Sequence, residues 1–127
     1  MQTLLLVALG GGTGAVLRYL LGVQAVRTLG HGWPYGTFAA NVVGGLLMGV
    51  LAGWLAHRSG ADGEKWRILL GVGVLGGFTT FSAFSLEVAL MIERRAWAEA
   101  FGYSLGSVVV SVAALFAGLL LVRRFYA

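Results

Sequence analysis

Long apolar runs, separated by short polar connections, are the main pattern along this chain. Asp, Glu, Lys and Arg are absent from three long windows, residues 28–57, 68–86 and 100–122. A fourth apolar stretch covers residues 1–23 and is interrupted only by Arg18. Because a helix needs roughly 17–25 residues to cross about 30 Å of hydrocarbon, each stretch can span a membrane. The pattern predicts four transmembrane helices. Their expected ranges are about 4–23, 34–56, 66–92 and 98–122.

Aromatic residues and a proline mark the ends of these predicted helices. All four tryptophans (Trp33, Trp54, Trp66 and Trp97) lie near the ends of apolar stretches, where an amphipathic ring prefers the headgroup region. Pro34 stands at the start of the second helix, where the first N–H groups have no helical partner anyway. The four helices use nearly the whole chain, so we expect a single transmembrane domain over residues 1–127.

Composition agrees with a membrane protein and excludes several other classes. Charged residues make up 11% of the chain and hydrophobic residues 58%, whereas soluble domains carry about 25% charged residues. Cysteine is absent, which excludes disulfides, thiolate metal sites and thiol nucleophiles. The net charge of +4 comes from basic residues scattered among helix ends, and nucleic-acid binding needs a clustered basic face instead. We therefore expect no nucleic-acid partner. No nucleophile–base pair can be assembled either, so we expect that the protein is not an enzyme.

Basic residues are divided almost equally between the two sides of the predicted bundle. One side holds Arg58, Lys65, Arg67, Arg123 and Arg124, and the other holds Arg27, Arg94 and Arg95, with Arg18 close to it. Orientation in a membrane normally follows an excess of Lys and Arg on the cytoplasmic side. A chain with so small an excess can insert both ways, which favours an antiparallel dimer. A single orientation set by another signal stays open.

Small residues recur at every fourth position of the first two helices. On the first helix, Gly10, Gly14 and Gly22 share a face with Arg18. On the second, the same interval is kept by Thr37, Asn41, Gly45, Gly49 and Gly53. Small residues four apart let helix backbones approach closely in lipid. Packing therefore explains the glycines but leaves the polar residue in each stripe unexplained.

The middle of the predicted third helix has a sequence that forms a helix poorly. The run GGFTTFSAFS, residues 76–85, begins with paired glycines followed by two β-branched threonines. Non-helical backbone inside a membrane is tolerated only where it is buried in protein or lines a watery cavity, and freed carbonyls of broken helices can bind small cations. We predict a break near residues 76–80, at mid-membrane, with carbonyl oxygens facing a cation. An intact helix with a small-residue packing face is the alternative.

Aromatic and hydroxyl side chains follow this run and recur on the fourth helix. Phe81 and Phe84 are three residues apart, with Ser82 and Ser85 beside them. Rings at this spacing usually pack in a core, but their positive edges can also receive a small anion, together with amide and hydroxyl donors. On the fourth helix, a row of hydroxyls four residues apart either bonds the backbone one turn back or forms a polar track. The row is Tyr103, Ser107 and Ser111.

Two ionisable residues lie within the predicted spans. Ionisable groups inside a membrane are costly, and they usually mark function or pair with one another. Glu87 lies in the third helix, and Arg18 lies near the end of the first, where it can instead extend to the interface.

Three segments, in order along the chain, resemble motifs of one family. They are GGTGAVLRY at residues 11–19, GTFAANVVG at 36–44 and GGFTTFS at 76–82. Together with the four-helix plan, they identify the chain as similar to the CrcB/Fluc fluoride channel family over its whole length. One departure is Ala83, where the family commonly has threonine.

The resemblance implies a fold, a location and a task. The expected assembly is an antiparallel, dual-topology homodimer with two pores, in the inner or plasma membrane and surrounded by lipid. The expected task is passive export of fluoride that entered as the neutral acid, without ATP.

The resemblance also implies roles for particular residues. The ring edges of Phe81 and Phe84 would line the fluoride path, with Ser82 beside them. Asn41 would donate its amide to the ion, and the hydroxyl track would consist of Tyr103, Ser107 and Ser111. Backbone carbonyls of Gly76 and Thr79 from both subunits would hold one structural Na⁺ that is not transported. Arg18 and Glu87 match family positions near the vestibule and the pore.

Two other kinds of membrane protein remain as alternatives. A small dual-topology multidrug exporter also has four short helices, but it needs a carboxylate on its first helix to bind cations. The first helix here offers Arg18 and no acid, and Glu87 lies on the third. An accessory membrane subunit with no transport of its own is the second alternative.

Overall fold

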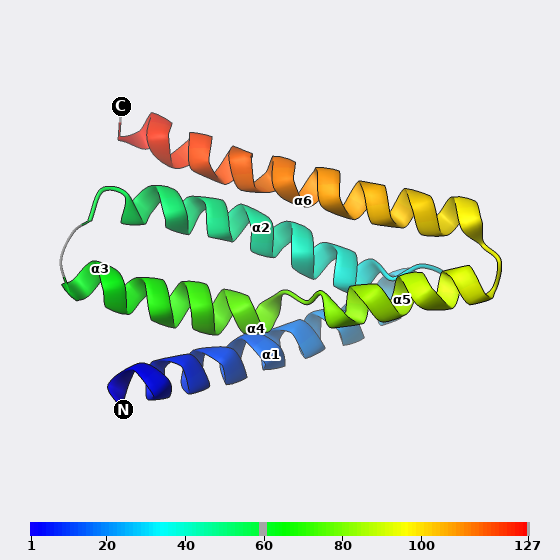
Figure 1. Cartoon of the computed structure of the whole chain (residues 1–127), viewed down its shortest axis with the longest axis horizontal. Helices are drawn as coiled ribbons and strands as arrows, with labels where there is room; N and C mark the ends of the chain where they lie inside the picture. The colour runs from blue at the N-terminus through cyan, green and yellow to red at the C-terminus, as the bar shows by residue number, and fades with distance from the viewer. Residues whose placement is uncertain (59–60, 127) are drawn as a thin grey trace.

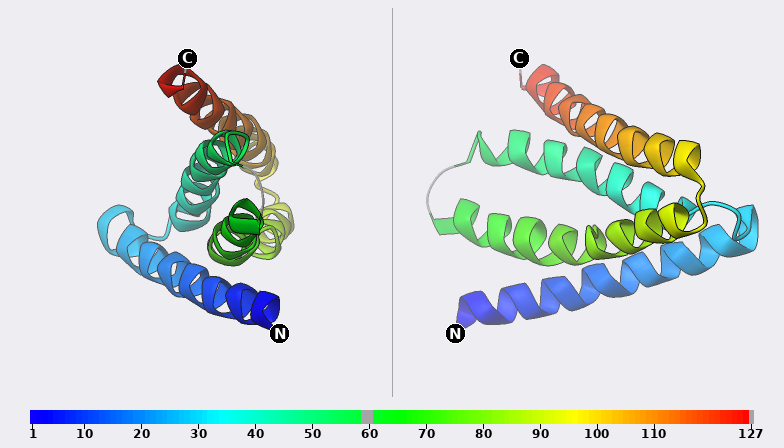
Figure 2. Two further views of the ribbon diagram at one scale, coloured as in Figure 1. Left: turned by 90° about the vertical axis from the view of Figure 1, so that its left-hand side faces the viewer. Right: turned by 45° about the vertical axis from the view of Figure 1, so that its right-hand side comes forward.

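The computed structural model describes residues 1–58 and 61–126, and within these ranges every regular element is a helix. The elements are α1 (Gln2–Leu29), α2 (Tyr35–Leu55), α3 (Ala61–Trp66), η1 (Arg67–Leu75), α4 (Gly76–Phe78), α5 (Ser82–Glu93) and α6 (Trp97–Phe125). They form an elongated bundle in which α2 and the α3–α5 segment lie between α1 and α6 (Figures 1 and 2).

Four helical segments of this bundle are long and apolar enough to cross a membrane, which confirms the predicted four-span plan. Their ranges are Gln2–Leu29, Tyr35–Leu55, Asp62–Glu93 and Trp97–Phe125. Only 11% of the most apolar window of the first span is buried within the chain. The remaining apolar surface is far larger than a monomer in water would expose, so it faces lipid or another protein.

The first helix is longer than its apolar pattern predicts. It continues to Leu29, whereas the prediction ended it near residue 23 and assigned residues 24–31 to a loop. Gln24 and Thr28 are polar but compatible with a helix, and Gln24 Nε2 donates a hydrogen bond to Thr28 Oγ1 one turn away (3.1 Å). The helix ends at Gly30, whose φ of 85° favours glycine.

The two outer helices approach their neighbours through glycines. A Cβ added at Gly10 of α1 would lie 2.9 Å from Gly73 Cα of η1. A Cβ added at Gly45 of α2 would lie 2.7 Å from the carbonyl oxygen of Ser111 on α6. These contacts confirm that the glycine stripes allow close backbone packing.

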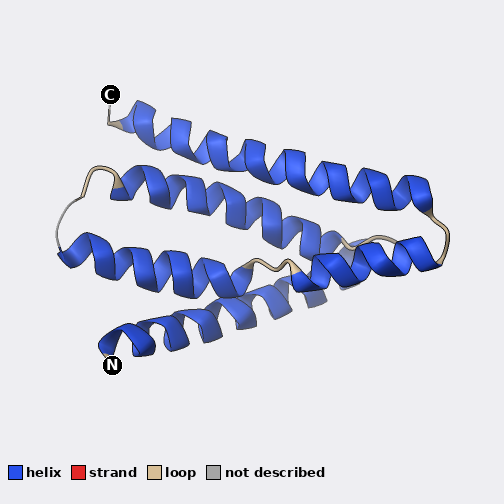
Figure 3. Cartoon of the chain, in the orientation of Figure 1, coloured by secondary structure: helices blue, strands red, loops and turns tan. Residues whose placement is uncertain are grey.

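The backbone hydrogen-bond pattern of the third span changes twice. Over η1 it is a π-helix, and the N–H of Gly76 bonds the carbonyl of Gly71 five residues back. The α-helix then resumes but ends at Phe78, and Thr79 is extended (φ −86°, ψ 161°). Helix α5 begins at Ser82, so a short loop separates α4 from α5 (Figure 3). The sequence pattern did not predict the π-helix.

Candidate functional site

Asn41 on α2 pairs with the backbone of the loop between α4 and α5. Its Nδ2 donates to the Thr80 carbonyl (3.0 Å), and its Oδ1 accepts a hydrogen bond from the Thr80 N–H (2.9 Å). The side chain therefore bonds both main-chain polar groups of Thr80, which the interrupted helix leaves available. An amide NH₂ carries two donors, and this pairing uses one of them.

The carbonyls that lose their α-helical donors at this loop include the two that the family resemblance assigns to Na⁺. In a continuous α-helix the N–H of Thr80 would bond the Gly76 carbonyl, and the N–H of Ala83 would bond that of Thr79. Here the Thr80 N–H donates to Asn41, and the Ala83 N–H donates to Thr80 Oγ1 (3.2 Å). The carbonyls so released belong to Gly76 and Thr79, the residues that family resemblance assigns to Na⁺.

A cavity of about 450 Å³ lies against this loop and brings together most of the predicted path residues. Its lining includes Asn41, Gly76, Thr79, Thr80, Phe81, Phe84, Ser107 and Ser111. All the described residues that line this cavity are uncharged. We call this space the hydroxyl cavity.

Two hydroxyls in the hydroxyl cavity are buried without a hydrogen-bond partner among the described residues. They are the Oγ atoms of Ser107 and Ser111 on α6, and Ser107 is only 6% exposed. A buried hydroxyl without a partner costs free energy, and native proteins rarely leave one in that state unless water or a ligand bonds it. These serines therefore do not simply bond their own helix backbone.

Three aromatic rings continue from the hydroxyl cavity along α5 and α6. The centroids of Phe81 and Phe84 are 5.6 Å apart, and those of Phe84 and Tyr103 are 5.1 Å apart. Tyr103 is buried, whereas Phe81 is 76% exposed in the single chain. Ser82 is also exposed, and its Oγ lies 3.3 Å from Thr80 Oγ1.

Glu87 on α5 accepts hydrogen bonds on both of its carboxylate oxygens. Tyr103 Oη donates to one oxygen (2.7 Å) and Thr37 Oγ1 donates to the other (2.8 Å). Thr37 was not among the predicted path residues. The sequence feature that could have identified Thr37 is its position one helical turn before Asn41, in the stripe of small and polar residues on α2.

Arg18 lies against the third span. Its Nε is 3.5 Å from the carbonyl oxygen of Gly77 in α4, at the outer limit of a hydrogen bond. Among the described residues, the ion pairs are Glu64–Arg67 and Arg94–Glu99. Arg18 and Glu87 therefore form no ion pair with one another there.

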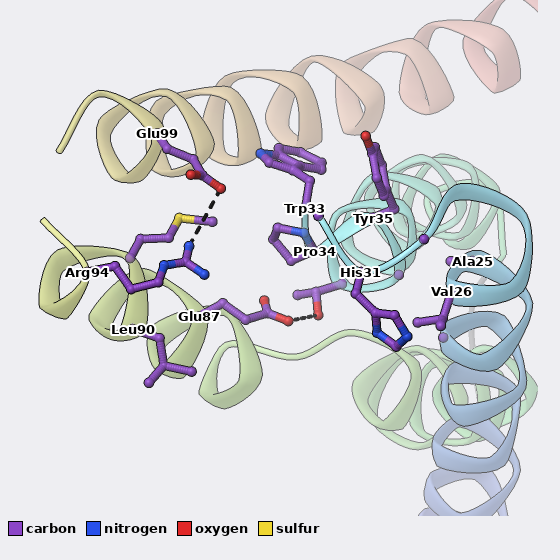
Figure 4. A pocket seen from close by; sticks show the side chains of 16 residues that line it. Ala25, Val26, His31, Trp33, Pro34, Tyr35, Glu87, Leu90, Arg94 and Glu99 are labelled. Carbon is purple, nitrogen blue, oxygen red and sulfur yellow. Dashed lines mark hydrogen bonds and ion pairs between the residues drawn. The ribbon is translucent and has the colours of Figure 1, made fainter. Parts of the chain in front are cut away.

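A second cavity begins where Glu87 lies. It has a volume of about 320 Å³ and lies where α1, α2, α5 and α6 meet (Figure 4). Thr37 and Glu87 line it together with His31, Arg94 and Glu99. We call it the end cavity. Phe84 lines the hydroxyl cavity and packs on Tyr103, which bonds Glu87, so these side chains lie between the two cavities.

These features define a multi-pass, α-helical membrane protein whose polar and aromatic side chains gather beside the interrupted third span. The chain belongs to the family described as "CrcB-like protein, Camphor Resistance (CrcB)", which matches residues 5–119. The family identified from the sequence motifs is confirmed.

Three relatives carry the same description, "Fluoride-specific ion channel FluC". The protein of Phenylobacterium zucineum (strain HLK1) is 76% identical over 127 residues, with full coverage of both chains. That of Caulobacter sp. (strain K31) is 68% identical over 126 residues, covering 99% of this chain and 98% of the relative. That of Hyphomonas neptunium (strain ATCC 15444) is 52% identical over 127 residues, again covering both chains fully. These names describe channels, which agrees with the expectation of a protein that is not an enzyme.

Proposed function

We propose that the protein is a fluoride-selective channel through which fluoride leaves the cytoplasm passively. The single observation that carries this proposal is that Ser107 and Ser111, two residues that line the hydroxyl cavity, have buried hydroxyls with no hydrogen-bond partner among the described residues. An anion crossing that cavity would accept hydrogen bonds from both. The names of the relatives supply the identity of the ion.

The hydroxyl cavity offers an anion several weak donors and no fixed positive charge. Hydroxyls, the second N–H of Asn41 and the positive edges of Phe81 and Phe84 are all of this kind. A conducting ion must bind well enough to enter and weakly enough to leave. Uncharged donors meet both conditions better than a buried arginine, which would hold fluoride too tightly.

The proposed unit is an antiparallel homodimer with dual topology. The even division of basic residues between the two ends supports insertion in both directions. Phe81 lines the hydroxyl cavity yet is 76% exposed, so one chain alone leaves this side open. A second copy covering this side would close the path and place the interruption of the third span at mid-membrane.

A structural Na⁺ fits the residues at the interruption. The carbonyls of Gly76 and Thr79 have lost their helical donors to Asn41 and Thr80, and carbonyl oxygens are ligands that small hard cations accept. The cation would be held by these carbonyls from both subunits and would offset their negative dipole ends where the two interruptions meet. It would not be transported. A crystal prepared with a heavier monovalent cation should show anomalous density there, and water alone in a well-resolved map would contradict the site.

Flux from liposomes tests the function directly. Purified protein should release fluoride but not chloride, with no dependence on ATP or on a proton gradient. Proton-coupled uptake of an aromatic cation would instead indicate the small multidrug exporter. The exporter needs a carboxylate on its first helix, and α1 has none. Glu87 lies on α5 instead, where it already accepts hydrogen bonds from the hydroxyls of Thr37 and Tyr103.

A further inference from the structure

The end cavity has charged side chains at its outer part and polar, partly buried ones deeper in. The side chains of Arg94, the residue directly after α5, and of Glu99 on α6 are 60% and 34% exposed. Glu87 on α5 is partly buried and accepts a hydrogen bond from Thr37. Figure 4 shows Arg94 joined to Glu99 by a dashed line, with Glu87 at an earlier position on α5. On the path of the proposed function, an ion that left the hydroxyl cavity past Tyr103 and Glu87 would meet this pair before it reached water.

Arg94 and Glu99 form a loose ion pair across the short connection between α5 and α6. Arg94 Nη2 lies 3.7 Å from Glu99 Oε1, beyond direct hydrogen-bond distance. Arg94 caps the end of α5, Glu99 is in the first turn of α6, and Arg95 between them has a φ of 60°. The tight connection keeps two opposite charges side by side at the cavity.

Helix ends alone would account for charges of these signs. A cation favours the C-terminal end of a helix, and an anion favours the N-terminal end. That role concerns stability only, and it predicts no effect on ion flux. What it does not explain is that both side chains also line a cavity leading to Glu87.

We propose that Arg94 and Glu99 together set the local concentration of anions at this entrance. This inference rests on the proposed function as a fluoride channel. Arg94 attracts fluoride to the end cavity, and Glu99 opposes that attraction by cancelling part of its field. Charges at the opening of a low-dielectric cavity change the local concentration of a permeant ion, and salt screens this effect. The other titratable residues that line the end cavity are His31, Tyr35 and Glu87.

Removing one charge at a time should move fluoride flux in opposite directions. We expect Glu99→Gln to raise the initial rate of fluoride efflux from liposomes by roughly two- to fivefold, and Arg94→Gln to lower it by a similar factor, at low ionic strength. The double variant, which restores the net charge of the pair, should return close to the wild-type rate. At about 1 M of an impermeant salt the Debye length falls to about 3 Å, so all four rates should converge.

The matched control is the ion pair of Glu64 and Arg67. Both side chains are more than half exposed, and neither lines the end cavity. Glu64→Gln and Arg67→Gln should leave flux unchanged at either salt concentration. Each variant is compared with wild type by its elution volume in detergent, so that a folding defect is not counted as a change in flux.

The outcomes separate this inference from the proposed function. If wild type releases no fluoride, the proposed function fails and the inference falls with it. If wild type conducts but Arg94→Gln and Glu99→Gln leave the rate unchanged, or move it in the same direction, only the inference is overturned. Differences that persist undiminished at high salt would also overturn it, because they would not be electrostatic.

Discussion

Two kinds of helix contact occur in this bundle, and they differ in how closely the backbones approach. Where α1 meets η1 and where α2 meets α6, glycine places one backbone directly against another. Where α5 meets α6, the contact is made by side chains such as Phe84, Tyr103 and Glu87. The glycine contact between α1 and η1 is closed and lines neither cavity. The side-chain contact is open on both sides, because Phe84 lines the hydroxyl cavity and Glu87 lines the end cavity.

The difference shows how one short chain can combine tightly packed helices with polar side chains beside cavities. In lipid no hydrophobic effect drives helices together, so small residues are needed for tight packing. Polar groups are expensive there unless they are paired or face a polar cavity. The chain places its closest glycine contacts between α1 and η1 and between α2 and α6, and its carboxylate and rings between α5 and α6. Substitutions at the two kinds of contact should therefore fail in different ways.

The largest effect is expected from a side chain added at the closed contact. A Cβ at Gly14 would lie 2.8 Å from the Phe78 N and would overlap the carbonyl of Val74. Gly14→Leu should prevent the third span from packing on α1, with loss of both folded protein and flux, because overpacking against backbone costs at least about 1–3 kcal/mol. The measurement is the yield and elution profile in detergent. Gly12→Leu on the same helix, where the added Cβ meets open space, is the control.

The next largest effect is expected from removing an aromatic edge at the open contact. Phe81→Ile should abolish fluoride flux while the protein still elutes as the wild-type assembly does. Phe81 is 76% exposed, so little packing within the chain is lost. Liposome efflux and size-exclusion chromatography together test this expectation. Retained flux would show that the ring edge does not contact the ion.

A smaller effect is expected from Ser107→Ala. Loss of the hydroxyl should lower fluoride flux by roughly tenfold or more, because a hydrogen bond to a charged partner is worth about 1.5–3 kcal/mol. The thermal stability should stay the same or rise, because the buried hydroxyl has no protein partner among the described residues. Ser104→Ala, on the same helix but outside the lining of the hydroxyl cavity, is the control. A fall in stability with unchanged flux would mean that Ser107 is only structural.

The smallest effect is expected from Tyr103→Phe. This change keeps the ring that packs on Phe84 and removes only the hydroxyl that donates to Glu87. The free energy of unfolding should fall by about 1.5–3 kcal/mol, the usual range for a hydrogen bond to a charged group. Thermal melting in detergent measures it. Tyr19→Phe on α1 is the control, since Tyr19 is 70% exposed, and an equal loss there would contradict the assignment.

Composition and spacing predicted the spans well because lipid imposes a simple length requirement. The end of α1 was missed because polar residues such as Gln24 do not stop a helix, whereas Gly30 does. The π-helix was missed because a shift from i→i+4 to i→i+5 bonding leaves no signal in residue type. At the third span, Gly76 and Gly77 remain helical, and the non-helical residues are Thr79, Thr80 and Phe81.

The sequence pointed to several residues of the candidate site, though not to Thr37, and it did not predict how they pair. Asn41, Glu87 and Tyr103 stood out because polar groups are rare inside apolar spans. Their partners depend on how helices rotate against one another, which one sequence does not specify. Asn41 meets the backbone of Thr80, and Thr37 meets Glu87 across 50 residues of chain. The ion path itself stays a prediction.

The double hydrogen bond between Asn41 and Thr80 has a mechanical consequence. One residue of helix rises 1.5 Å, so sliding α2 past the third span by a single residue would break both bonds at once. The two spans are thereby coupled as a single body, and glycine contacts tie α1 and α6 to them. Such coupling suits a channel, in which ions diffuse through a permanent pore. It suits less well a transporter that must change conformation in every transport cycle.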